Sequence, residues 1–435
     1  MFYSHWGKKD EIKQMLIKSN YKEPIDHSGI PVIYEGNTVY TTRAGAHTLV
    51  VGVTGSGKTQ TMILPRIKLS MLAEESIIVN DSKGELYKQT AKELKNRGYN
   101  VIVLDYDKSI YGNYYNPLSL AYNLYKENDK DKSTRLLEEI GYYLFSDPKS
   151  TSDPFWENSV IDYFTGLCLY LFKKNKKEAT IREVYELCMS LSDDKEAKDF
   201  LNEIRKDNRI YCYVSGTLSA PKDTKGSIIS VANQKFKYYI SKEKLTEMMS
   251  KTDFDIKRIS NEKTAIFILN GCYESSYTLI PLFINQVLEC IDYYGRNKRV
   301  NMILDDFDKL KPIKDFELLI NGSRYNNISF TVVIQSFVNL INTYGKDNYE
   351  IIKLCFSNIV YLYANDLFTL EEISKLCGKE SEKSLLVTPE ELKVFKPFES
   401  LFIIPRTMPF RSILTPDYKI DWNINFEEAE FELRK

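Results

Sequence analysis

The chain has 435 residues, of which 43% are hydrophobic and 27% charged, with 59 basic and 60 acidic side chains. This length is enough for two or three domains, and the formal net charge of −1 excludes a protein that grips nucleic acid by bulk charge, although a locally basic groove or ring is compatible with it. No apolar run approaches the ~18–20 residues of a membrane span. Seven cysteines without a CxxC pair and three histidines without an HExxH motif argue against a disulfide framework and a histidine-based metal centre.

Short apolar segments alternate with a helical one early in the chain. Residues 47–51, 76–80 and 101–104 are typical of strands, and residues 84–97 predict a helix that ends at Gly98. Near-continuous apolar strands separated by helices are typical of a parallel sheet that is covered on both faces. The sequence therefore predicts an α/β fold with a mostly parallel sheet.

A glycine-rich loop follows the first of these strands. Residues 52–59, GVTGSGKT, match GxxxxGK[ST] in full and precede a predicted helix, which is the context that this phosphate-binding motif requires. Glycines let the backbone wrap phosphates, and the N–H groups of the loop and the helix start point at the anion. Lys58 would reach the β- and γ-phosphates of ATP, and the Thr59 hydroxyl would ligate Mg²⁺. The residues expected to bind the nucleotide are Thr54, Gly55, Ser56, Gly57, Lys58, Thr59 and Gln60. Pro65 is expected to kink or shorten the next helix.

The strand signal then disappears from about residue 120 to residue 247. Apolar residues recur there at three- and four-residue spacing, which predicts helices. Strands return at 264–269, 301–304, 328–334 and 358–363, with helices between them. We therefore expect a nucleotide-binding domain in two parts, residues 1–123 and 248–435, with an all-α domain inserted at residues 124–247.

A phosphate loop needs an acidic strand end to hold the metal ion. The best candidate is the apolar strand that ends in Asp305 and Asp306. Asp305 would hold the Mg²⁺ shell through water or Thr59, and Asp306 would orient or deprotonate the attacking water. Strands that end in Asp81 and Asp105 compete for this assignment when spacing alone is considered.

Two further polar residues lie near the strand at 328–334. Gln335 follows this strand at the edge where parallel sheets bind ligands, so its side chain could sense the γ-phosphate. An equally good interpretation is that Gln335 and Ser336 form a cap before the next helix. Arg324 lies just ahead of the strand, and a lone arginine is usually a surface charge.

Several segments, in this order along most of the chain, resemble the TraG-type coupling ATPases of type IV secretion and conjugation. DSKGEL, NPL and FWE are more specific to that family than the phosphate loop is. The matching segments are the Trp6 lead-in, GVTGSGKT at 52–59, DSKGEL at 81–86, NPL at 116–118, FWE at 155–157, LDDF at 304–307, VIQS at 333–336, LCG at 376–378 and TPE at 388–390.

The resemblance implies a RecA-like nucleotide-binding domain with an all-α insertion, assembled into a hexameric ring that uses ATP and Mg²⁺. It maps the family's Walker B acidic pair onto Asp305 and Asp306, its sensor glutamine onto Gln335 and an arginine finger, which acts across subunits, onto Arg324. The family's usual second acidic residue is Glu, so Asp306 is one methylene shorter than expected.

The resemblance also implies a function. We expect a motor that recruits relaxase-bound single-stranded DNA and feeds it to a type IV secretion channel, with relaxosome and secretion components as partners. Typical members begin with transmembrane helices, which this sequence lacks, so we expect a cytoplasmic protein at the inner face of the membrane with a membrane partner or a separately encoded anchor. The alternatives are a coupling ATPase for protein effectors and a nucleotide-gated recruitment adaptor that scarcely hydrolyses ATP.

Overall fold

The computed structural model describes residues 3–147, 153–270, 274–295, 297–323 and 325–434, which divide into two compact units. The α/β unit contains Met1–Val103, Ile256–Asn270 and Leu288–Phe431. The helical unit contains Leu104–Asp255, Gly271–Val287 and Glu432–Lys435. Among the described residues, none of the helices combines the length and the apolar character that crossing a bilayer demands.

The main sheet has the strand order β12-β11-β10-β4-β9-β8-β5-β7-β6 in the described chain. Neighbouring strands from β10 to β7 are parallel, and β11 and β12 join one edge in antiparallel pairing. The strands are β4 Thr48–Gly52, β5 Ser76–Asn80, β6 Asn100–Asp105, β7 Thr264–Leu269, β8 Val300–Leu304, β9 Ile328–Ile334, β10 Asn358–Tyr363, β11 Glu399–Ile403 and β12 Phe410–Ile413. This sheet confirms the predicted α/β class.

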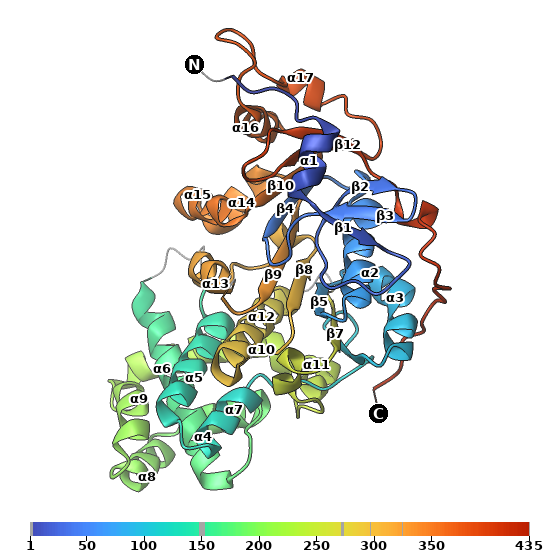
Figure 1. The fold of residues 1–435 in the computed structure, drawn as a ribbon. Coiled ribbons are helices and arrows are strands. Elements are labelled where there is room, and N and C mark those ends of the chain that lie inside the picture. Colours follow the sequence, from blue (N-terminus) through green and yellow to red (C-terminus); the bar gives the residue numbers. More distant parts are fainter. Residues whose placement is uncertain (1–2, 148–152, 271–273, 296, 324, 435) are drawn as a thin grey trace. The chain divides into compact units, whose positions relative to one another are not determined.

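The central strands are apolar because both faces of the sheet are covered. Every residue of β4, β5, β7, β8 and β9 is buried. Figure 1 shows α2 and α3 on one side of these strands and α13 and α14 on the other. The helices of this unit are α1 Lys9–Met15, α2 Leu64–Leu72, α3 Glu85–Asn96, α13 Phe316–Ser323, α14 Phe337–Tyr344, α15 Lys346–Cys355, α16 Leu367–Cys377 and α17 Pro389–Leu392, while α12 Glu274–Tyr294 contributes residues to both units.

A small antiparallel sheet, which the sequence did not predict, packs near α2. Its order is β1-β3-β2, with β1 Ile17–Asn20, β2 Pro31–Glu35 and β3 Thr38–Thr41. Tyr21 and Val39 from this region form one apolar cluster with Leu69 and Leu72 of α2 and with Trp422. The cluster ties the beginning and the end of the chain to the helix that follows the phosphate loop.

The acidic segment that closes the chain, residues 426–432, contains no helix. Phe431 stacks on Tyr87 with ring centroids 4.7 Å apart, and the Lys68 ammonium lies 4.0 Å from the centre of the Phe426 ring. In Figure 1 this segment, in red, runs beside α2 and α3. Packing of its aromatic rings outweighs the weak helical preference of a short charged segment.

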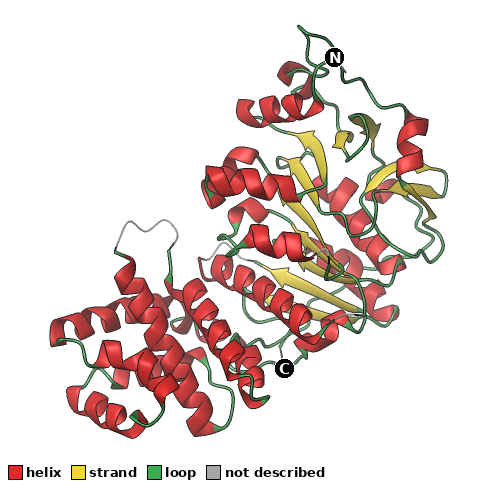
Figure 2. Ribbon diagram, turned by 60° about the vertical axis from the view of Figure 1, so that its left-hand side comes forward, coloured by secondary structure: helices red, strands yellow, loops and turns green. Residues whose placement is uncertain are grey.

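The helical unit contains no strand apart from the end of β6 among its described residues, as Figure 2 shows. Its interior is aromatic, because Phe145, Phe164 and Phe236 come together from three helices with Phe145 within 5.2 Å of each partner ring. Asp153 caps the start of the longest helix here, and a Thr180–Glu183 capping box starts another. The helices are α4 Ser119–Lys126, α5 Lys130–Phe145, α6 Pro154–Asn175, α7 Ile181–Ser190, α8 Asp194–Ile204, α9 Asn208–Leu218, α10 Lys222–Ile240 and α11 Glu243–Met248.

The expected insertion, residues 124–247, lies inside the helical unit, which extends beyond it at both ends. Asn116 accounts for part of this difference. Its side chain donates to the Ala179 carbonyl at 2.8 Å, and its N–H donates to the Thr252 hydroxyl at 3.0 Å. The NPL segment therefore ties residues on either side of the expected boundaries into the helical unit, so 104–123 belongs there rather than to the nucleotide-binding part.

Candidate nucleotide-binding site

The phosphate loop, residues 52–59, leaves the carboxyl end of β4 between β9 and β10. Gly55 and Gly57 have φ angles of +84° and +91°, which side-chain-bearing residues rarely adopt. A Cβ at Gly52 would lie 2.5 Å from the Ser56 hydroxyl and 3.0 Å from the Lys58 chain. Each of these glycines is therefore required for the loop to curl around a phosphate-sized anion.

Lys58 and Thr59 lie where the loop passes into a helix. This helix starts with a π-helical turn, η1 Thr59–Ile63, and continues as α2, with Pro65 in the first turn of α2. Proline lacks an N–H, so Pro65 cannot donate to the helical hydrogen-bond ladder that runs on from η1. The helix continues through Pro65 to Leu72, and the change from the π-turn to α-helix lies just before the proline. π-turns often mark functional sites.

Carboxylates gather at the same edge of the sheet. Asp305 follows β8 and Asp81 follows β5, and these two strands are paired in parallel. Burial raises the pKa of each of these carboxyl groups to about 6, although the Lys58 charge opposes that shift at Asp305 and backbone N–H groups oppose it at Asp81. Asp81 also accepts a hydrogen bond from the Tyr87 N–H at 2.8 Å, so it anchors the start of α3.

Asp306 contacts two of the other predicted site residues, Lys58 and Gln335. Its backbone has a φ of +50°, which is uncommon for a residue with a side chain. One carboxylate oxygen lies 3.9 Å from the Lys58 ammonium and accepts a hydrogen bond of 3.3 Å from the Gln335 amide. The other lies 2.9 Å from the Lys309 ammonium. Burial would raise the pKa of Asp306, but the hydrogen bond and charge of Lys309 hold it below its usual value.

Asp308 forms hydrogen bonds that position Gln335 next to Asp306. It is buried, and one of its oxygens accepts from the Gln335 N–H and from the Asn339 side chain, each at 3.0 Å. Ser336 accepts from the Asn339 N–H at 3.1 Å and so caps α14. The capping interpretation thus applies to Ser336, whereas the Gln335 side chain points toward Asp306.

Five buried polar atoms around the loop and strand ends make no hydrogen bond with any described residue: Ser56 Oγ, Gln60 Oε1, Asn80 Oδ1, Asn270 Oδ1 and Asp308 Oδ1. Unpaired buried polar atoms are rare and call for a partner. The described residues contain no ready-made cluster of three acidic, histidine or cysteine ligands. A phosphate-bound Mg²⁺ needs only one or two protein oxygens, so Thr59 and Asp305 fit it.

A cavity of about 450 Å³ adjoins the loop. The residues that line it are 53–57, Leu362, Tyr363, Asn365, Lys393 and 395–398. Its volume lies within the usual range for small-molecule sites. Lys309, Asp308 and residues 393–398 were missed by sequence reasoning. The position of Lys309, three residues after the candidate base Asp306, could have indicated its role. Nothing in the sequence indicated the role of Asp308 or of the segment that lines the cavity.

The structure brings Lys58, Asp305, Asp306 and Gln335 to one edge of the sheet, as the order of the strands requires. Arg324 lies outside the described residues.

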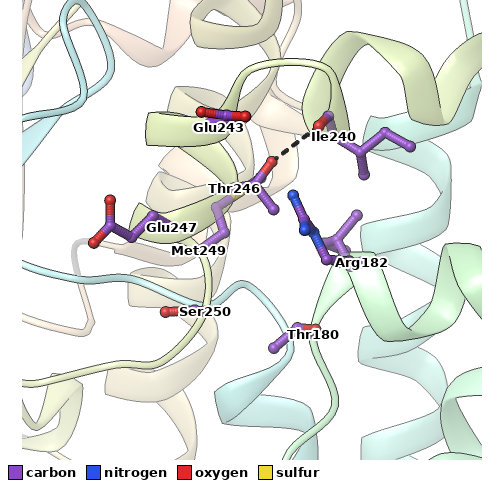
Figure 3. Close-up of a pocket in the computed structure, with 9 residues that line it drawn as sticks. Thr180, Arg182, Ile240, Glu243, Thr246, Glu247, Met249 and Ser250 are labelled. Carbon is purple, nitrogen blue, oxygen red and sulfur yellow. Dashed lines mark hydrogen bonds between the residues drawn. The ribbon is translucent and has the colours of Figure 1, made fainter.

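A second cavity, of about 280 Å³, lies in the helical unit between the start of α7 and the end of α10 with α11. Figure 3 shows Arg182 reaching from α7 toward Ile240 and Thr246, whose hydroxyl donates to the Ile240 carbonyl at 3.3 Å. Glu243 and Glu247 lie on the α11 side. The residues that line the cavity thus include one cationic and two acidic residues.

Comparisons with known proteins agree with this architecture. The structure is similar to the plasmid coupling protein TrwB in complex with the ATP analogue ADPNP, with a TM-score of 0.71, 14% identity and coverage of 99% of this chain and 97% of that one. It is also similar to VirB4 of Thermoanaerobacter pseudethanolicus, with a TM-score of 0.58, 12% identity and coverage of 91% and 98%. These likenesses confirm the predicted RecA-like fold.

Sequence relatives point the same way. The type IV secretion system-coupling protein VirD4 of Bartonella quintana is 26% identical over 316 residues, which is 66% of this chain and 46% of that protein. The VirD4 of Bartonella henselae is 24% identical over 362 residues, or 77% and 53%. The chain thus spans about half the length of these relatives.

A family model described as type IV secretory system conjugative DNA transfer matches residues 5–388. Since this match covers most of the chain, the protein belongs to the type IV secretory system conjugative DNA transfer family.

Proposed function

We propose that this protein binds Mg·ATP at the phosphate loop and hydrolyses it. The backbone N–H groups of residues 54–60 would hold the phosphates, Lys58 would neutralise charge on the β- and γ-phosphates, and Thr59 and Asp305 would hold Mg²⁺. Asp306 would orient and accept a proton from the attacking water, and Gln335 would keep its carboxylate aimed.

The single observation that carries this proposal is the convergence on Asp306. Lys58, from the phosphate loop, and Gln335, from the end of β9, both approach one oxygen of this carboxylate, at 3.9 and 3.3 Å. The site therefore brings together a cation that can bind phosphate, Lys58, a candidate base, Asp306, and a polar group that orients this base, Gln335. TrwB, the relative in structure, has been solved with ADP and Mg²⁺ and with analogues of ATP and GTP, which supports the same use of this site here.

Steady-state phosphate release by the wild-type chain and by Lys58→Ala tests the proposal. The variant should lose at least about 10²-fold in turnover, because the lost charge stabilises the transition state. Lys68→Ala is a poor control because its side chain is buried, so the exposed Lys92→Ala serves instead. Equal turnover in wild type and Lys58→Ala would remove the phosphate loop from the reaction.

We further propose that hydrolysis drives transfer of relaxase-bound single-stranded DNA into a type IV secretion channel, at the inner face of the membrane. Family membership supports this function, together with the VirD4 relatives. Relaxosome and secretion components, including a membrane partner, would be the protein contacts. Arg324 would act as an arginine finger in the neighbouring site of a homohexamer. DNA-stimulated ATP hydrolysis tests the choice of cargo.

One observation favours protein effectors as a second cargo. The cavity in the helical unit is mostly apolar and is also lined by Arg182, Glu243 and Glu247, a composition suited to a short peptide. Arg182→Glu would then weaken stimulation of ATPase activity by secreted protein and leave stimulation by single-stranded DNA unchanged. Equal loss of stimulation by secreted protein and by single-stranded DNA would show that Arg182 has a structural role and does not bind cargo.

A different class of function is a recruitment adaptor that binds ATP and scarcely hydrolyses it. The observation that favours it is the short, ion-paired side chain of Asp306. Normal ATP binding with background hydrolysis would establish the adaptor.

A further inference from the structure

The cavity beside the phosphate loop has one wall that no motif predicted. Phe395, Lys396, Pro397 and Phe398 line it opposite residues 53–57. Phe395 and Phe398 are half-buried and are here called the aromatic wall. All of these residues belong to the α/β unit.

Phe398 is held in a strained backbone conformation. Its φ is +67°, an outlier for a bulky residue. Its carbonyl accepts from the Leu414 N–H at 2.9 Å, and the turn before it is closed by the Glu399 N–H on the Lys396 carbonyl at 3.0 Å. A Cβ on Gly57 would lie 3.3 Å from the Phe398 ring, so this ring touches the phosphate loop itself. Such strain is characteristic of ligand-holding positions.

The Phe395 ring is held in place by contacts with Tyr361 and Arg411. Its ring meets Tyr361 of β10 edge to face, with centroids 5.6 Å apart, and the Arg411 guanidinium lies 5.2 Å from its centre. Arg411 also lies 4.2 Å from the centre of the Trp6 ring. A ring clamped in this way offers its free surface to the cavity at little entropic cost.

The remaining groups are polar. Lys393 and Lys396 are exposed and form no ion pair with the described residues, and Asn365 is an exposed amide on the same cavity. Aromatic surface, ammonium groups and an amide together suit a nucleoside, whose base stacks on apolar rings and whose ribose is polar.

We propose that this cavity is the nucleoside subsite, in which Phe398 and Phe395 hold the base of the nucleotide whose phosphates lie in the loop. The inference rests on the proposed binding of ATP. It adds the part of the site that recognises a base, built by a segment about 340 residues after the loop. Because the rings recognise a π-face, they contribute affinity and little discrimination between purines.

Titration calorimetry with two probes, Mg·ATP and Mg-bound inorganic tripolyphosphate, separates the subsite from the phosphate loop. Phe398→Ala and Phe395→Ala should each weaken ATP binding roughly 5- to 150-fold, the range for loss of one stacking ring. Both should bind tripolyphosphate as the wild type does, because that probe has no nucleoside. Phe398→Leu, which keeps apolar bulk, should fall between Phe398→Ala and wild type. Phe368→Ala, a partly exposed phenylalanine that does not line the cavity, is the matched control.

The outcomes are distinguishable. Unchanged ATP affinity in both alanine variants overturns the subsite while leaving ATP binding by the chain intact. Loss of tripolyphosphate together with ATP makes the aromatic wall a structural support of the loop, and also overturns the subsite. A wild-type chain that binds neither probe overturns the proposed function itself.

Discussion

The direction of the Asp306 carboxylate is set by the backbone conformation of this residue, because the Asp side chain is one methylene shorter than the usual Glu. A left-handed φ of +50° directly after β8 turns this short side chain toward Lys58 and Gln335. Holding such a conformation costs of order 1–3 kcal/mol, which the surrounding structure must supply. Asp306 itself is held by the Lys309 N–H, which donates to its carbonyl at 3.0 Å, and by the Gln335 amide, which donates to its carboxylate at 3.3 Å.

Asp306→Asn tests the role of this carboxylate. We expect Mg·ATP binding close to that of wild type and turnover lower by about 10²–10⁴-fold, because the amide cannot accept the proton of water. Binding of a fluorescent ATP analogue and phosphate release measure the two effects separately. Asp315→Asn, at an exposed position with a similar φ of +52°, is the control. If binding is lost instead, Asp306 is a metal ligand and the roles of the acidic pair are reversed.

Lys309 is a positioning residue on this account, since its ammonium lies 2.9 Å from Asp306 and fixes the second carboxylate oxygen. Lys309→Met should lower kcat by about three- to tenfold and leave KM for ATP unchanged, because a half-exposed ion pair contributes about 1 kcal/mol. Lys309→Arg should keep most of the activity. A rise in kcat for Lys309→Met would show that the ion pair restrains hydrolysis.

At the scale of elements, the central sheet follows from the sequence because its strands are buried on both faces and read as short apolar runs. The strand predicted at 328–334 is β9, Ile328–Ile334, and the one predicted at 76–80 is β5, Ser76–Asn80. Strand ends then bring Asp305, Gln335 and the phosphate loop together, since the carboxyl ends of parallel strands share one edge.

Other elements depend on tertiary contacts that local sequence does not encode. The small sheet, β1 to β3, is short and partly polar, and is stabilised by packing with α2 and Trp422. The final segment is held by contacts with distant parts of the chain, namely the stacking of Phe431 on Tyr87 and the antiparallel bridge between Leu433 and Tyr111. The aromatic wall of the cavity could not be predicted either, because its link to the phosphate loop is a contact of Phe398 with Gly57, across about 340 residues of chain.

A buried ion pair fastens the end of the chain to α2. Lys68 and Asp417 are 2.6 Å apart with side chains 6% and 7% exposed, and Trp422 donates to Asp417 at 3.0 Å. Asp417→Ala should lower the free energy of unfolding by about 3–5 kcal/mol, since it leaves the Lys68 charge buried without a counter-ion.

The pair Lys68→Met with Asp417→Leu should recover much of this loss, because it removes both charges and keeps the volume. Urea denaturation monitored by circular dichroism measures each variant. An unfolding free energy for Asp417→Ala within about 0.5 kcal/mol of wild type would show that water screens this pair.

At the scale of the whole molecule, the described residues form an α/β unit with the proposed nucleotide site and a helical unit, and the proposed motor needs several copies. Arg324 follows the acidic pair by eighteen residues and precedes β9. An arginine finger supplied by a neighbouring subunit accelerates phosphoryl transfer by about 10³–10⁵-fold in known cases. Isolated chains would therefore hold incomplete sites.

The most direct test of this account is ATP turnover per chain, measured with single-stranded DNA over a hundredfold range of protein concentration. If subunits share their sites, turnover rises steeply with concentration, and Arg324→Ala binds ATP but hydrolyses almost none. Mixing this variant with Lys58→Ala protein then restores part of the activity. Turnover per chain that is independent of concentration and DNA, and unchanged in Arg324→Ala, would contradict the account of a DNA-coupled motor with shared sites.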